Sequence, residues 1–208
     1  MKTYPIMLNM QGRTAVVVGG GPVALRKAHA LRRAGAMVRL VAAQLDSDAD
    51  VDGMTVLREP YQPRCLEGAA LALACTNDRA ANAAIARDAR AAGALVNVAD
   101  QPDDCDFFLP ATAGDGDVTV AVGTGGAAPA LAAELKRQLQ QALPPRVGEF
   151  AAALQQLRAE LKAQGGNAAR RGRILHRLAG GAMYRIYIAE GLPALRAAMN
   201  ALASDADT

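Results

Sequence analysis

The chain has 208 residues, of which 51% are hydrophobic and 21% are charged, so it can bury a core and is not disordered by composition. Aromatic residues make up only 3% and Trp is absent, which argues against a single-stranded nucleic-acid binder that stacks bases on aromatic rings. The formal net charge of +3 is too small to indicate a nucleic-acid or membrane partner. The charge is uneven, because residues 1–143 carry 14 basic and 15 acidic side chains whereas residues 144–208 carry 9 and 5.

The pattern of residues 1–143 predicts strands that alternate with helices. The strands are expected at 14–18, 37–41, 55–57, 71–74, 95–98 and 119–122, and the helices at 23–34, 80–92 and 129–142. The first strand (TAVVV) is a β-branched apolar run, typical of a strand covered on both faces. Lys27 lies within the apolar stripe of the first helix. Alternating strands and helices predict an α/β fold with a Rossmann-like, mostly parallel, doubly wound sheet.

Pro144 and Pro145 interrupt this alternation, and the sequence after them is helical in pattern. We expect helices at 147–163, 171–189 and 192–203, and therefore two domains, 1–143 and 144–208. A basic cluster falls in the second domain and consists of Arg170, Arg171, Arg173, His176 and Arg177. It is either a solvated helix face or a seat for an acidic substrate.

The spacing of the cysteines and the hydropathy pattern indicate which compartment and which kinds of bound metal to expect. Cys65, Cys75 and Cys105 are too widely spaced for a disulfide framework or a zinc site, so no metal site is expected. No apolar run follows Lys2, and the uncharged stretch 118–133 is interrupted by Gly and Pro, so neither a signal peptide nor a membrane span is expected. A cytoplasmic location follows as a prediction.

A glycine motif follows the first strand and opens the first helix. The run Gly19-Gly20-Gly21-Pro22-Val23-Ala24 matches G-x-G-x-x-A, in which glycines permit a tight turn and a close approach to a dinucleotide pyrophosphate. Pro22 has no N–H, so Val23 is the expected phosphate contact, beside Gly19 and Gly21. A tight turn without a ligand is the alternative.

Other candidate cofactor residues follow the second and fourth strands. Ala43 can line the adenine of a dinucleotide, and Gln44 can accept a hydrogen bond from its ribose, at the place where related sites have an acidic residue. We expect NAD as the cofactor, and NADP stays open as the alternative. The segment Thr76-Asn77-Asp78 is interpreted as a helix cap formed by Asn77 or Asp78, as a loop at the edge of the cofactor site, or as both at once.

Two polar segments near later strand ends are candidates for the substrate site. Asn97-Val98-Ala99-Asp100 opens an acidic loop that is either a solvated turn or a general-base site. Residues Thr124, Gly125 and Gly126 either bind an anion or turn the chain.

Taken together, the motifs resemble the precorrin-2 dehydrogenase and sirohydrochlorin ferrochelatase family, which comprises the amino-terminal half of siroheme synthase and its stand-alone relatives. The resemblance is carried by residues 4–8, 16–42, 74–86, 96–111 and 118–132. It implies NAD-dependent oxidation of precorrin-2 to sirohydrochlorin, with ferrous iron insertion to siroheme in some members. It also implies a homodimer whose helical region closes on the substrate, and a separate methyltransferase that supplies precorrin-2.

The resemblance assigns roles residue by residue. Asp100 corresponds to the family's general base, and Asn97, Thr124, Gly125 and Gly126 are the expected substrate-binding residues. The family's cofactor contacts fall on Pro22, Val23, Ala43 and Gln44, with Thr76, Asn77 and Asp78 at the border. The chain departs from the family at Ala133, where arginine is common. Two alternatives stay open: a non-catalytic NAD-sensing module that does not depend on Asp100, and an enzyme that is chiefly a sirohydrochlorin metal chelatase.

Overall fold

The structure is a computed structural model that describes residues 3–165 and 167–205. Internal contacts divide the chain into two compact units. The first comprises Met1–Leu109 with Gly125–Ala127, and the second comprises Pro110–Thr124 with Ala128–Thr208. The predicted division into a cofactor-binding domain, 1–143, and a helical domain, 144–208, stays a prediction.

The first unit is built on a five-stranded parallel sheet. Its strands are β1 (Thr14–Val18), β2 (Met37–Val41), β3 (Thr55–Leu57), β4 (Ala69–Ala74) and β5 (Leu95–Val98). Their order is β3-β2-β1-β4-β5, so the chain moves outward on one side of β1 and then returns to the other side. This reversal between β1 and β4 is the place where open α/β sheets bind ligands at the carboxyl ends of the strands. The α/β, Rossmann-like prediction is confirmed.

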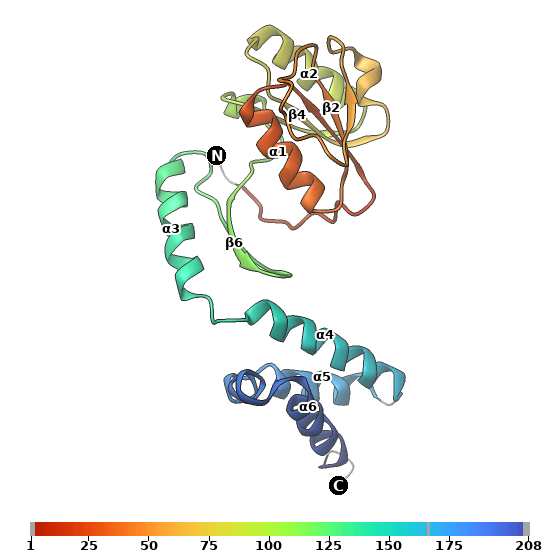
Figure 1. The fold of residues 1–208 in the computed structure, drawn as a ribbon, viewed down its shortest axis with the longest axis vertical. Coiled ribbons are helices and arrows are strands. Elements are labelled where there is room, and N and C mark those ends of the chain that lie inside the picture. Colours follow the sequence, from red (N-terminus) through yellow and green to blue (C-terminus); the bar gives the residue numbers. More distant parts are fainter. Residues whose placement is uncertain (1–2, 166, 206–208) are drawn as a thin grey trace. The chain divides into compact units, whose positions relative to one another are not determined.

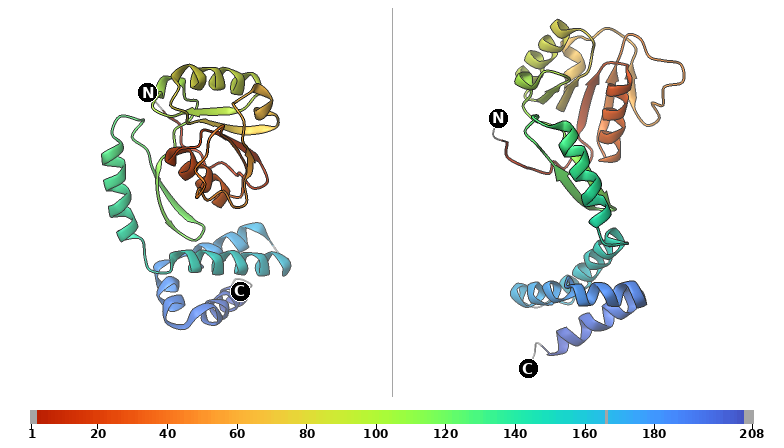
Figure 2. Two further views of the ribbon diagram at one scale, coloured as in Figure 1. Left: turned by 45° about the horizontal axis from the view of Figure 1, so that its top comes forward. Right: turned by 90° about the vertical axis from the view of Figure 1, so that its left-hand side faces the viewer.

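Two helices cover opposite faces of this sheet, α1 (Pro22–Arg33) and α2 (Arg79–Ala91) (Figures 1 and 2). Ala15 and Val17 of β1 belong to the core under α1, whereas Val16 and Val18 belong to the core under α2. All four are almost fully buried, as expected for a strand covered on both sides. Two short 3-10 helices complete the unit, η1 (Pro63–Leu66) and η2 (Pro102–Asp104).

The predicted strand at 119–122 exists, but it does not join the parallel sheet. It is part of β7 (Val118–Val122), which pairs antiparallel with β6 (Ala111–Asp115), a strand that the sequence reading missed. A tight turn at Gly116, whose φ is 55°, sends the chain straight back and so produces a hairpin. The helix α3 (Pro129–Ala142) contacts both strands, and the Gln140 side chain bonds the N–H and the carbonyl oxygen of Gly114 at 2.9 and 3.1 Å.

The rest of the second unit is helical, with α4 (Val147–Ala163), α5 (Ala168–Leu178) and α6 (Gly181–Asp205) around a core that includes Leu157, Leu178 and Leu195. The prediction of one continuous helix at 171–189 is wrong. The chain breaks after Leu178, where two consecutive glycines, the residues that favour helix least apart from proline, follow Ala179. A second break at Gly191, with φ of 74°, lies just before the predicted helix at 192–203. None of the helices in the described ranges has both the length and the apolar character needed to cross a membrane.

Candidate functional site

The glycine loop is confined on two sides and open on a third. A Cβ added to Gly19 would lie 2.4 Å from the carbonyl oxygen of Cys75 after β4, and one added to Gly20 would lie 2.2 Å from that of Gln44 after β2. Gly19 also has φ of 130°, which L side chains rarely adopt. Around Gly21, in contrast, a Cβ would meet no atom within 4 Å. The loop therefore passes between the ends of β2 and β4 and leaves free space beside Gly21.

That free space adjoins the N-terminus of α1. The helix begins at Pro22 with Gly21 as its N-cap, and its first turn contains no acidic residue. The earliest helical hydrogen bond runs from Leu25 N to Gly21 O at 3.1 Å, and Val23 is 42% exposed. First-turn N–H groups and the helix dipole together attract anions. The residues present therefore fit the pyrophosphate of a dinucleotide, with Gly19 and Gly21 shaping the turn.

The loops after β2 and β4 flank this position. Ala43 and Gln44 are exposed directly after β2. After β4, Asp78 caps α2, because its Oδ1 accepts hydrogen bonds from Ala80 N and Ala81 N at 2.8 and 3.2 Å. The capping alternative is thus confirmed for Asp78, while Asn77 is exposed and its contact with a cofactor stays a prediction.

The segment around Thr76 is held by a residue that the sequence reading missed. Asn82, 4% exposed within α2, accepts hydrogen bonds from Thr76 N and Oγ1 at 3.1 and 2.7 Å and donates to Thr76 O at 3.0 Å. A polar side chain in an otherwise alanine-rich stretch, four residues after a capping Asp, was the available signal.

Asp100 follows β5 in an unusual backbone conformation. Its φ is 58°, and it is one of two non-glycine residues with positive φ in the described part of the chain. Asp and Asn tolerate this left-handed region better than most residues, and such conformations concentrate at functional sites. The side chain is exposed, and the preceding Ala99 N–H still bonds Ala74 O at 2.9 Å. Asp100 is therefore presented at the carboxyl end of β5, next to β4 in the sheet.

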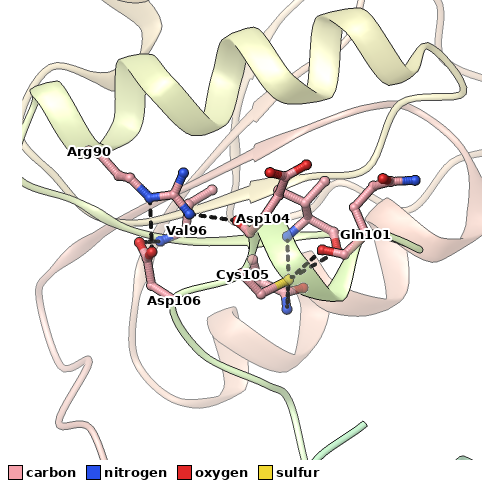
Figure 3. Close-up of polar contacts among 8 residues, drawn as sticks. Arg90, Val96, Gln101, Asp104, Cys105 and Asp106 are labelled. Carbon is pink, nitrogen blue, oxygen red and sulfur yellow. Dashed lines mark hydrogen bonds and ion pairs between the residues drawn. The ribbon is translucent and has the colours of Figure 1, made fainter. Parts of the chain in front are cut away.

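The loop carrying Asp100 is attached to the outer edge of β5 by Cys105 and Asp106 (Figure 3). The thiol of Cys105 accepts a hydrogen bond from Val98 N at 3.2 Å and lies 3.3 Å from the carbonyl oxygens of Val98 and Gln101. Asp106 binds Val96 twice, through N to Val96 O at 2.8 Å and through Oδ2, which accepts from Val96 N at 3.0 Å.

Arg90 of α2 holds this attachment in place. Its Nε donates to Asp106 Oδ1 at 2.9 Å and its Nη2 donates to Asp104 O at 2.8 Å (Figure 3). Of the acidic side chains in this loop, that of Asp106 is thus bound at the edge of the sheet. Over residues 3–165 and 167–205, no three or more His, Cys, Asp or Glu side chains gather in a way that could hold a metal ion.

Replacing Asp106 by alanine is expected to destabilise the protein by about 1–3 kcal/mol, because Val96 N–H loses its acceptor in a half-buried position and Arg90 loses its counterion. Urea denaturation followed by circular dichroism measures the change. Asp103→Ala removes an exposed carboxylate from the same loop and should cost less than about 0.5 kcal/mol. Equal stabilities for the two variants would contradict the structural role given to Asp106.

The glycine-rich segment before α3 turns the chain. Thr124 Oγ1 accepts a hydrogen bond from Ala128 N at 3.3 Å in the second unit. In the first unit, Gly125 and Gly126 have φ of 61° and 81°, and a Cβ on Gly126 would lie 3.5 Å from the ring of Phe108. The turn alternative is confirmed, and the binding of an anion or substrate here stays a prediction.

Comparison with known proteins adds three findings. A family described as "Putative NAD(P)-binding" matches residues 6–111. The chain is 38% identical over 175 residues to the siroheme synthase of Stutzerimonas stutzeri, covering 82% of this chain and 38% of that protein. It is 41% identical over 159 residues to the siroheme synthase of Nitrosococcus oceani, covering 73% and 34%. The chain thus spans little more than a third of these relatives.

Among solved structures, SirC, a precorrin-2 dehydrogenase, superposes with a TM-score of 0.74 at 23% identity. The match covers 95% of this chain and 100% of that one, so the two share a fold over nearly their whole length.

Proposed function

The chain belongs to the NAD(P)-binding family, and on that premise we propose that it oxidises precorrin-2 to sirohydrochlorin with NAD as the hydride acceptor. The observation that carries the proposal is the placement of Asp100, which a left-handed backbone presents at the carboxyl end of β5, two strands from the glycine loop of β1. The names of the relatives, siroheme synthase and precorrin-2 dehydrogenase, support the choice of substrate.

The protein's own residues have three tasks in this reaction. The N–H groups at the start of α1 bind the pyrophosphate, and the space beside Gly21 lets it approach the backbone. Ala43, Gln44 and the Thr76–Asp78 segment flank the nucleotide. When bound, NAD supplies the acceptor for the hydride that leaves the substrate. The substrate must also lose a proton, and the carboxylate of Asp100 accepts it as general base.

Anaerobic turnover of enzymatically generated precorrin-2 with NAD tests the proposal. Appearance of the sirohydrochlorin absorbance is the expected result, and ferrous iron added in a second step tests for metal insertion, for which Asp100 is the candidate proton acceptor. If the protein binds NAD but does not oxidise precorrin-2, the dehydrogenase proposal fails and a nucleotide-sensing module is the better account. If the protein does not oxidise precorrin-2 but inserts iron into sirohydrochlorin that is supplied separately, the protein is chiefly a chelatase.

We also propose that the chain forms a homodimer in the cytoplasm. The support is a row of leucines on α3, Leu131, Leu135 and Leu139, which are spaced four residues apart on one helix face and are 52%, 36% and 38% exposed. An aligned apolar row of this kind is typical of a surface that another chain covers.

Exposed Arg173, His176 and Arg177 on α5 are candidates for binding the carboxylates of the substrate.

Leu135→Glu is expected to convert the dimer largely to monomer, because it places a charge in the middle of the leucine row where a dimer would bury it. Analytical ultracentrifugation measures the mass in solution. Lys136→Glu changes the neighbouring exposed residue to the same side chain on a different helix face and should leave the dimer intact. A wild-type monomer, or a Leu135→Glu dimer of unchanged stability, would refute this interface.

A further inference from the structure

The amide of Asn97 is buried at the end of β5 and is fully engaged. Its neighbours Val96 and Val98 belong to the core under α2, so the side chain of Asn97 points to the opposite face, toward α1. Asn97 is only 7% exposed. Its Nδ2 donates to Phe107 O at 3.0 Å and contacts Cys105 Sγ at 3.4 Å, and its Oδ1 accepts from Lys27 Nζ at 2.9 Å. Lys27 and the carbonyl group of Phe107 together fix which way this amide is turned.

Lys27 itself is unusual for a lysine. It lies in the buried stripe of α1, between the nearly inaccessible Ala24 and Ala28, and is half-buried. It donates a hydrogen bond to the uncharged amide oxygen of Asn97, and within the described part of the chain it forms no ion pair with a carboxylate. Partial burial removes some of the water around the ammonium group, and the hydrogen bond to Asn97 compensates for part of that loss.

Electrostatic effects on one thiol show what surrounds this ammonium group. Burial raises the pKa of the Cys75 thiol; the charge and hydrogen bonding of Lys27 lower it, and the carboxylate of Asp100 raises it further. Lys27 from α1 and Asp100 after β5 therefore both lie within electrostatic reach of Cys75, which follows β4. The backbone of Cys75 is in turn the surface against which Gly19 packs, so this group of residues adjoins the glycine loop.

We propose that Lys27 is a positioning residue of the oxidation site, which holds the Asn97 side chain at the end of β5 from which Asp100 projects. This inference rests on the proposed function. The Lys27–Asn97 hydrogen bond of 2.9 Å ties α1 to β5, the strand from whose carboxyl end Asp100 projects, so Lys27 helps to fix where the base lies. The hydrogen bond of Lys27 is made to Asn97 of β5, whereas the expected pyrophosphate contacts lie at Gly21 and Val23, so the two tasks can be tested separately.

Three variants separate the charge from the hydrogen bond. Lys27→Met removes both, Lys27→Gln keeps a donor without the charge, and Lys27→Arg keeps both. We expect kcat for precorrin-2 oxidation to fall about 10- to 100-fold in Lys27→Met, with the Kd for NAD changed less than about twofold, and to recover substantially in Lys27→Arg. Lys162→Met, at an exposed position of α4, is the matched control and should behave as the wild type.

A second readout needs neither substrate nor cofactor. The pH dependence of iodoacetamide alkylation, resolved at Cys75 by mass spectrometry, reports the pKa of that thiol. Because Lys27 lowers this pKa, the midpoint of the alkylation rate against pH should move to higher pH in Lys27→Met and Lys27→Gln. It should stay near the wild-type value in Lys27→Arg.

The outcomes distinguish this inference from the proposed function. An unmoved Cys75 midpoint in Lys27→Met shows that the Lys27 ammonium group does not lie beside Cys75 and so overturns its placement at the oxidation site, whatever the activity. Loss of activity accompanied by an equal loss of NAD affinity, without rescue by arginine, overturns the positioning role and leaves a merely structural lysine. Wild-type protein that binds NAD without oxidising precorrin-2 overturns the proposed function, while the midpoint still reports the charge at the site.

Discussion

Asp100→Asn is expected to lower kcat for precorrin-2 oxidation by about 10²–10⁴-fold, the usual contribution of a general base. Asparagine has nearly the same shape but cannot accept the proton at neutral pH. It also tolerates the left-handed conformation that Asp100 adopts, with φ of 58°, so the loop should keep its form. The measurement is anaerobic turnover with saturating NAD, followed by the absorbance of sirohydrochlorin.

Asp103→Asn is the matched control for this variant, since it neutralises an exposed carboxylate three residues further along the same loop. Its kcat should equal that of the wild type, and both variants should unfold at the wild-type temperature. Turnover by Asp100→Asn within a few-fold of the wild type would assign the proton to another group and remove Asp100 from the mechanism.

Gly19→Ala is expected to destabilise the protein by about 2–5 kcal/mol, which combines the strain of a positive φ with the cost of overpacking. The new Cβ would lie 2.4 Å from the backbone oxygen of Cys75, and neither the glycine turn nor the end of β4 can move without disturbing the sheet. Urea denaturation measures the loss in the free energy of unfolding.

Gly21→Ala separates stability from binding. No atom lies within 4 Å of the added methyl group and the N-cap has ordinary backbone angles, with φ of −81° and ψ of 175°. The loss of stability should stay below about 1 kcal/mol, whereas the Kd for NAD, measured by calorimetry, should rise about tenfold or more, because the methyl group fills the space open to the pyrophosphate. Unchanged NAD affinity in Gly21→Ala would show that the dinucleotide does not approach the loop.

The parallel sheet could be predicted from local patterns because each strand is an apolar run bounded by turn residues. Strands at 14–18, 37–41, 55–57 and 95–98 were predicted at their observed bounds. Of the two strands of the hairpin, only β7 was predicted. The sequence of β6, 111–115 (ATAGD), has no apolar run and includes a glycine, Gly114, which pairs with Thr119 of β7. The Asp115-Gly116 dipeptide was the signal that would have located its turn.

The parts of the candidate site that consist of consecutive residues could be predicted from the sequence. The parts that depend on contacts between distant segments could not. The glycine loop and the segment ending at Asp100 are contiguous motifs that lie where expected at strand ends. Lys27, Cys105 and Asp106 gain their roles only when α1, β5 and the acidic loop come together. In the sequence, Lys27 is merely one polar residue in an apolar stripe, and Asp106 is one of several acids.

The attachment of the acidic loop to β5 also bears on how the protein behaves at high concentration. An open sheet normally ends in a strand whose outward N–H and carbonyl groups can template a strand from another molecule, which is a route to aggregation. Here the N–H and carbonyl groups of Val96 are taken by Asp106, and Cys105 Sγ lies within hydrogen-bonding distance of those of Val98. Cys105 and Asp106, through two side chains and one backbone N–H, thus occupy the place of a sixth strand and block this edge of the sheet to a strand from another molecule.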